Sequence, residues 1–71
     1  MKDELEPMRE YLEEMSFDLV KVSGTYEEMR FDVPDKTTAI LLRHALAGDV
    51  EFAGGIAVTK KGKCSLWGKG N

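Results

Sequence analysis

Few side chains in this chain could carry chemistry, and their spacing does not favour a catalytic or metal site. His44 is the single histidine and therefore the only candidate general base near neutral pH. Cys64 is the single cysteine, so no disulfide can form within the chain, and one His and one Cys twenty residues apart do not suit a structural zinc site. The adjacent carboxylates at residues 13–14 and 27–28 are typical of solvated faces. We therefore expect a non-enzymatic protein without a metal or cofactor, in which His44 is a helix-end cation or a packed side chain and Cys64 is a half-buried structural residue.

A basic segment near the C-terminus is the second group of candidate functional residues. Lys60, Lys61 and Lys63 precede Trp67, and Lys69 follows it. Lysines beside an aromatic ring can bind phosphates while the ring stacks on a base. Two interpretations stay open: a nucleic-acid contact, or a solvated hairpin whose lysines discourage pairing between sheet edges.

Charge is divided unevenly along the chain, which has a formal net charge of −3. Residues 1–35 hold eleven acids and four bases, whereas residues 36–71 hold two acids and six bases. The acidic half would repel the nucleic acid that the basic half attracts. Alternatively, the two halves lie across one another and partly neutralise their charges without any ligand.

Length predicts a single domain that spans residues 1–71. A chain this short buries only about 60% of its unfolded surface, so a partner chain or an unusually efficient core should support it. The first fifteen residues are acidic and lack an unbroken apolar run, and we therefore expect neither a signal peptide nor a membrane span. A lone cysteine fits a reducing compartment, which leads us to expect a cytoplasmic protein.

Two amphipathic helices are expected. The first should begin close to Glu6, because Pro7 is tolerated only in a first turn. Its apolar stripe, at i, i+3, i+7 and i+10, consists of Leu5, Met8, Leu12 and Met15. The second helix should be capped by Asp35 or Thr37, whose side-chain oxygens can accept from the first turn. It should end at Gly48, which adopts a left-handed backbone at little cost.

Four strands are expected at residues 17–23, 25–33, 50–59 and 64–67. In the second strand, Met29, Phe31 and Val33 alternate with charged residues, so one face should be buried and the other wet. The glycine pair at residues 54–55 suggests a bulge in the third strand. Residues 68–71, after the last strand, should fray.

The expected order is therefore α-β-β-α-β-β. Two hairpins joined through a helix most simply form one four-stranded antiparallel sheet with both helices on one face, an α+β fold. The other face should stay wet or be covered by another chain, because the third strand places mostly small residues there.

The central helix has an unusually wide apolar surface. Ile40, Leu41 and Leu42 are consecutive and spread beyond the roughly 100° arc that a surface helix needs. Two interpretations stay open: the helix is buried deeply in its own core, or it buries one side in the sheet and the other in a partner.

Residues 37–55 resemble the core motif of the small L subunit of archaeal RNA polymerase and its eukaryotic counterparts. That family combines a threonine-initiated helix containing Leu-Leu-Arg, a short break containing Asp, and a strand that reads Val-x-Phe-Ala-Gly. The matching residues are Thr38, Leu41, Leu42, Arg43, Asp49, Val50, Phe52, Ala53 and Gly54. The chain would be a distant or truncated relative, since it ends shortly after its last strand instead of continuing into a long helix. The resemblance implies a module that pairs with a related subunit and acts as an assembly platform in transcription.

We therefore expect a dimerisation or protein–protein interaction module that forms a homodimer or binds a related subunit. The expected interface on the central helix and the third strand consists of Leu41, Leu42, Arg43, Leu46 and Phe52. The alternative is a nucleic-acid-binding protein that uses Lys60, Lys61, Lys63 and Trp67.

Overall fold

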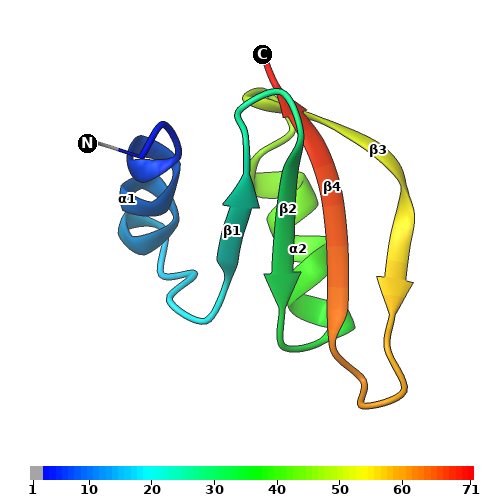
Figure 1. The fold of residues 1–71 in the computed structure, drawn as a ribbon. Coiled ribbons are helices and arrows are strands. Elements are labelled where there is room, and N and C mark those ends of the chain that lie inside the picture. Colours follow the sequence, from blue (N-terminus) through cyan, green and yellow to red (C-terminus); the bar gives the residue numbers. More distant parts are fainter. Residues whose placement is uncertain (1–2) are drawn as a thin grey trace.

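A computed structural model describes residues 3–71, which form a four-stranded antiparallel sheet and two helices, with the second helix against the sheet and the first helix beside the edge formed by the first strand (Figure 1). The elements follow in the order α1 (Glu6–Glu14), β1 (Lys21–Gly24), β2 (Met29–Val33), α2 (Lys36–Ala45), β3 (Val50–Val58) and β4 (Cys64–Gly70). This order confirms the predicted α-β-β-α-β-β arrangement and the α+β class.

The sheet has the strand order β1-β2-β4-β3, and all neighbouring strands are antiparallel. Its register places Val22, Phe31 and Leu66 side by side on one face, where all three are buried. The next row, with Arg30 beside Trp67, is exposed and lies on the opposite face. The sheet therefore has an inner face that packs against the helices and an outer face that meets solvent.

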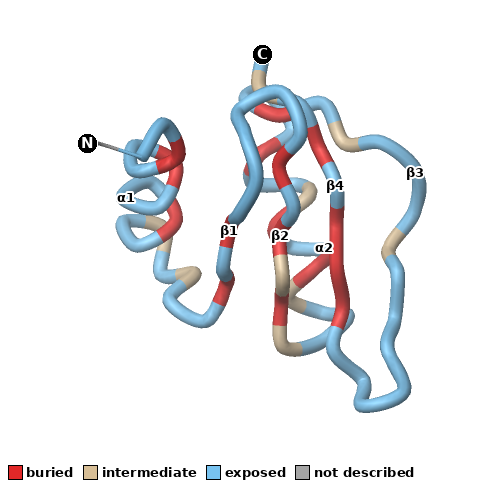
Figure 2. Tube along the Cα trace, viewed as in Figure 1, coloured by how far each residue is buried: buried red, intermediate tan, exposed pale blue. Residues whose placement is uncertain are grey.

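Both helices contribute to one hydrophobic core (Figure 2). Leu5, Met8 and Leu12 come from α1 and its N-terminal cap, as the predicted stripe requires. From α2 and its C-terminal cap come Ala39, Leu42 and Leu46, which are fully buried. These side chains join the inner-face residues of the strands in a single cluster, so the two helices share one side of the sheet.

Asp35 is the cap of α2, because the Thr38 backbone N–H donates to its Oδ1 at 2.7 Å. The predicted role of Gly48 is wrong, since the helix ends at Ala45 and Gly48 does not adopt a positive φ. Instead, Leu46 caps the helix, and its carbonyl accepts the backbone N–H of Val50 at 2.8 Å. That bond leads the chain directly into β3 while the Leu46 side chain stays in the core.

The first two strands are shorter than predicted. Residues 17–20 form a turn in which the Val20 N–H donates to the Phe17 carbonyl, so β1 begins only at Lys21. Residues 25–28 form a second turn, held by mutual backbone bonds between Thr25 and Glu28, and β2 begins at Met29. The alternation of buried and exposed residues predicted for this strand is confirmed.

The last strand is longer than predicted, and the expected fraying of residues 68–71 is wrong. Gly70 pairs with Val50, and the Asn71 N–H donates to the Asp49 carbonyl at 3.0 Å. The predicted irregularity at residues 54–55 is confirmed, because the register between β3 and β4 shifts there and Gly54 has a φ of 72°.

Candidate functional site

The predicted partner interface divides between the core and the surface. Leu42 and Leu46 are 0% exposed, so no partner can contact them while the chain is folded. Their place in the interface is therefore corrected: they share the side of α2 that faces the sheet. Phe52 is half-buried and its ring lies 5.7 Å from that of Phe31, so much of its surface is used within the chain. Leu41, in contrast, is 56% exposed.

Leu41 lies on the side of α2 that faces the loop between α1 and β1. It lines a shallow cleft of about 330 Å³ together with Phe17, Leu19 and Pro34. Leu19 is the most exposed large hydrophobic residue at 74%. The wide stripe of α2 therefore has an exposed apolar margin on this side, separate from its contact with β3.

The other margin of α2 faces β3. Ile40, Arg43, His44 and Ile56 line a cleft of about 350 Å³ between the helix and the strand. Burial decreases along β3, from Val50, which is buried, to Val58, which is 58% exposed. We refer to Ile40, Arg43, Ile56 and Val58, together with the free edge of β3, as the α2/β3 surface.

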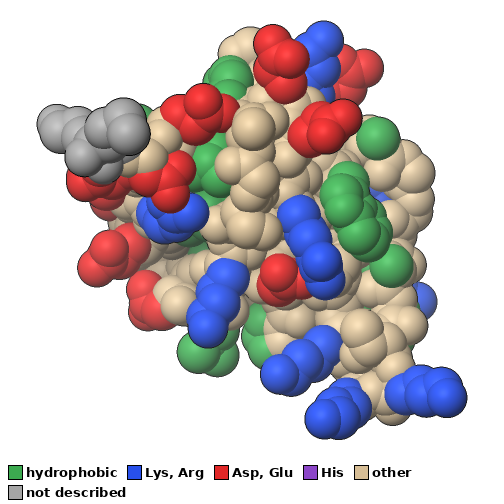
Figure 3. Space-filling model, in the orientation of Figure 1, with side chains coloured by type: hydrophobic (Ala, Val, Ile, Leu, Met, Phe, Trp, Pro, Cys, Tyr) green, Lys and Arg blue, Asp and Glu red, His purple; other side chains and the backbone are tan. Residues whose placement is uncertain are grey.

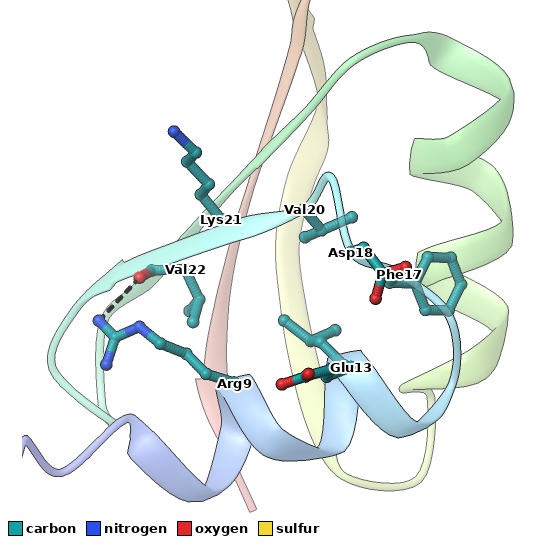
Figure 4. Close-up of a pocket in the computed structure, with 8 residues that line it drawn as sticks. Arg9, Glu13, Phe17, Asp18, Val20, Lys21 and Val22 are labelled. Carbon is teal, nitrogen blue, oxygen red and sulfur yellow. Dashed lines mark hydrogen bonds between the residues drawn. The ribbon is translucent and has the colours of Figure 1, made fainter.

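The two edges of the sheet differ in how they are covered. At the β1 edge, Arg9 reaches from α1 and its Nη2 donates to the Val22 carbonyl at 3.1 Å (Figure 4). The same guanidinium contacts Asp3 at 2.6 Å. At the other edge, β3 pairs with β4 alone, and no other segment of residues 3–71 pairs with its free side. The β3 edge is thus available to another chain.

A cleft of about 510 Å³ lies between α1 and β1 (Figure 4). Its lining includes apolar residues, such as Phe17 and Val20, and charged residues of both signs, such as Arg9 and Glu13. Among residues 3–71, no group of three or more His, Cys, Asp or Glu side chains is arranged to hold a metal ion.

His44 lies in the last turn of α2, near the helix end as predicted. Cys64 is more buried than expected, at 1% exposed, and its Sγ lies 3.8 Å from the Gly62 carbonyl oxygen. The thiol is therefore part of the core.

Trp67 lies on the outer face of the sheet, in the central strand β4. Its register partners are Arg30 on β2 and Ala53 on β3. The Arg30 guanidinium carbon is 5.9 Å from the centroid of the Trp67 ring, within the range of a cation–π contact. The sequence did not indicate this pair, because the two residues are distant along the chain and meet only through the pairing of β2 with β4.

The three candidate lysines, Lys60, Lys61 and Lys63, are exposed in the turn between β3 and β4. In Figure 3, Lys and Arg side chains gather toward this end of the sheet, whereas acidic side chains gather over α1 and the opposite end. The charge division seen in the sequence is therefore also a division in space.

Comparison with known proteins found no match: no protein-family profile, no curated protein and no solved structure is significantly similar to the chain. Within the described part of the chain, no helix is both long enough and apolar enough to cross a membrane.

Proposed function

We propose that this protein is a non-enzymatic self-association module, in which the free edge of β3 pairs with the same edge of a second copy. The observation that carries this proposal is β3 itself, a nine-residue edge strand. No other strand of residues 3–71 pairs with its free edge. Its only charged residue is Glu51, and it contains no proline. Edge strands that must stay single are protected by lysines, prolines, covering segments or bulges. Of these, β3 has only the irregularity around Gly54, and regular strand lies on both sides of it.

The apolar side chains of the α2/β3 surface extend this edge. Ile40 and Val58 are exposed, and Ile56 is half-buried in the cleft between α2 and β3. Pairing at the edge would bring the two copies of this surface together and remove it from water. The exposed apolar area and the open backbone therefore favour the same contact.

Charge selects an antiparallel arrangement of the two β3 strands. The start of the strand carries Asp49 and Glu51, whereas the turn after its end carries Lys60 and Lys61. An antiparallel pair brings the acidic end of one copy to the basic end of the other, as a two-fold symmetric contact requires. A parallel pair would bring like charges together.

The irregularity around Gly54 divides the edge into two regular segments. In the antiparallel pair, the segment after the irregularity in one copy lies beside the segment before it in the other, which keeps Lys60 and Lys61 close to Asp49 and Glu51 of the second copy. Residues 56–58 lie in the segment next to Ile40, so this segment combines free backbone with exposed apolar side chains.

Val58→Lys tests the proposal. Sedimentation over a micromolar concentration series should show a dimer for the unmodified chain and a shift toward monomer for the variant. Fully burying one Val is worth about 1.5 kcal/mol. Because Val58 is 58% exposed and each dimer contains two copies of it, the variant should lose about 1.7 kcal/mol, and the dissociation constant should rise roughly 20-fold. The matched control is Leu19→Lys, which makes the same chemical change at an exposed apolar residue away from β3.

Loss of the dimer in both variants, or its persistence in Val58→Lys, would contradict pairing through β3.

The resemblance of residues 37–55 to the polymerase L subunit supports the class of function, because that module also acts by pairing. It adds a related subunit as the other candidate partner. An unmodified chain that remains monomeric at every accessible concentration would overturn self-association and favour that partner.

A further inference from the structure

The outer face of the sheet presents an open aromatic ring at its centre. Trp67 is 42% exposed, although it lies in a central strand. Its neighbours across β3 and along β4 are Ala53 and Ser65, which are small and leave the ring uncovered on those sides. Arg30 contacts the ring from β2. A flat ring with small neighbours and one adjacent cation provides a platform on which another planar group can stack.

Positive charge surrounds this platform. Lys21 and Arg30 lie on the outer face of β1 and β2, and Lys69 follows Trp67 two residues along β4. Lys63 directly precedes the first residue of β4 and belongs to the lysines of the turn. It is four residues from Trp67, which is roughly 13 Å at the usual rise of a strand. An extended ligand lying along β4 would thus meet cations on both sides of the ring.

Each of the two acids on the outer face of the strands has a cation nearby, and Asp32 is directly paired with one. Asp32 Oδ1 accepts from Arg30 Nε at 3.1 Å and from the buried Ser65 hydroxyl at 2.9 Å. Glu51 is the register partner of Lys69. Most of the remaining acids lie on and around α1, away from the turn lysines (Figure 3). The negative net charge of the whole chain is therefore not the local charge of the outer face, where cations outnumber acids.

We propose that the outer face binds single-stranded nucleic acid, with one base stacked on Trp67 and the flanking phosphates held by Arg30 and the lysines of the β3–β4 turn. Stacking needs an unpaired base, which a single strand offers and a regular duplex does not. An acidic polypeptide could satisfy the lysines, but its carboxylates would make no use of the ring. The stacking site at Trp67 is separate from the self-association edge, because pairing at the β3 edge lies in the plane of the sheet.

Titration with oligonucleotides of about 10 nucleotides, within the site sizes of known single-strand binders, tests the proposal. Trp67 is the only tryptophan, so quenching of its emission reports directly on stacking. Oligothymidylate, oligouridylate and a duplex of the same length should be compared at about 0.15 M salt. We expect quenching by one or both single strands and little by the duplex, and the ratio of the two single strands tells whether DNA or RNA is preferred.

Three variants locate the contact, with anisotropy of a labelled oligonucleotide as the readout. Trp67→Ala should weaken binding roughly 5- to 150-fold, the range for loss of one stacked base, whereas Trp67→Phe should retain most of the affinity. Lys60→Gln combined with Lys63→Gln should lower the slope of log K against log salt by about 0.7 for each lysine that contacts a phosphate. Lys36→Gln is the matched control, because it removes a lysine at the start of α2, on the other face of the sheet.

Unchanged Trp67 emission at saturating oligonucleotide would overturn the proposal, as would an equal loss of affinity in Lys36→Gln. Polyglutamate that competes as well as the oligonucleotide without quenching would reassign the face to an acidic protein partner. Val58→Lys should bind nucleic acid normally, since Val58 pairs with the buried Cys64 and lies on the inner face. Failure of the dimer and failure of this proposal are therefore separate results.

Discussion

Replacing Leu42 by Ala should destabilise the fold strongly, whereas the same replacement at Leu41 should not. Leu42 is 0% exposed and lies in the core between α2 and the sheet. Removing three carbon atoms costs about 2.4 kcal/mol of transfer free energy, and the cavity left behind adds to it, so a loss of about 3–5 kcal/mol is expected. The entire stability of a chain of this length is roughly 4–11 kcal/mol. Leu42→Ala should therefore lower Tm by more than about 10 °C.

Leu41 is the matched control because it is the next residue of the same helix, and the change in helix propensity is therefore the same. Since it is 56% exposed, its replacement should cost at most about 1 kcal/mol. Thermal and urea denaturation of both variants at one protein concentration measures the difference, and fixing the concentration separates folding from association. Equal losses at the two positions would refute the assignment of Leu42 to the core and restore the wide helix face as a partner interface.

Two further outcomes follow from the backbone and from the capping carboxylates. Gly24→Ala should destabilise the fold by about 2 kcal/mol or more, because Gly24 has a φ of +93° and an added Cβ would collide with the rigid Glu28 carbonyl. The control is Gly48→Ala, which should stay within about 1 kcal/mol of the unmodified chain because Gly48 has no positive φ and open space around it. Urea denaturation compares the stability of the two variants. The Thr38 N–H lowers the pKa of Asp35 below its ordinary value of 3.8, so the stability that this carboxylate contributes is present above that value and is lost as the pH falls through the lowered pKa. Tm measured from about pH 6 to pH 2 should therefore show a smaller acid loss in Asp35→Asn, which keeps a capping oxygen without the titration, and an unchanged acid profile would contradict this role.

The local parts of the fold could be predicted from the sequence because short-range physics decides them. The clean alternation around Phe31 predicted the buried face of β2, and the two candidate caps, Asp35 and Thr37, predicted the start of α2 to within two residues. The glycine pair at residues 54–55 predicted the irregularity of β3, since a break in a strand needs backbone that few other residues supply. Each of these features depends on residues that are close together in the chain.

The errors arose where distant segments decide the outcome. The end of β4 reads as a glycine-rich tail, yet the Gly70 N–H donates to the Tyr26 carbonyl and the Tyr26 hydroxyl donates to the Asn71 carbonyl at 3.0 Å. The Tyr26 N–H is in turn accepted by the Glu4 carboxylate, so the turn before β2 connects both ends of the chain. No local pattern reveals such contacts, and the fraying predicted for this tail was therefore wrong.

The candidate surfaces depend on the same long-range information. A wide apolar stripe does not tell which arc of α2 meets the sheet, so Leu41 and Leu42 could not be separated before the fold was known. The sequence also left the strand order open, and that order alone makes β3 an edge and brings Arg30 beside Trp67. The lysines and the tryptophan were recognised as candidates, but the arginine that completes the aromatic platform was not.

The two proposed surfaces are compatible because β3 presents different chemistry in different directions. Its inner side carries Phe52, Ile56 and Val58, its free edge carries backbone groups, and its outer side carries small residues such as Ala53 and Ala57. An antiparallel pair of β3 strands would extend the sheet in its own plane, which uses the edge and gathers the inner apolar residues of both copies. The small outer residues would then lie between the two copies of Trp67, so the outer faces of the two copies would form one surface, on which Glu51 is the charged side chain that β3 contributes. Self-association would therefore widen the nucleic-acid platform rather than cover it.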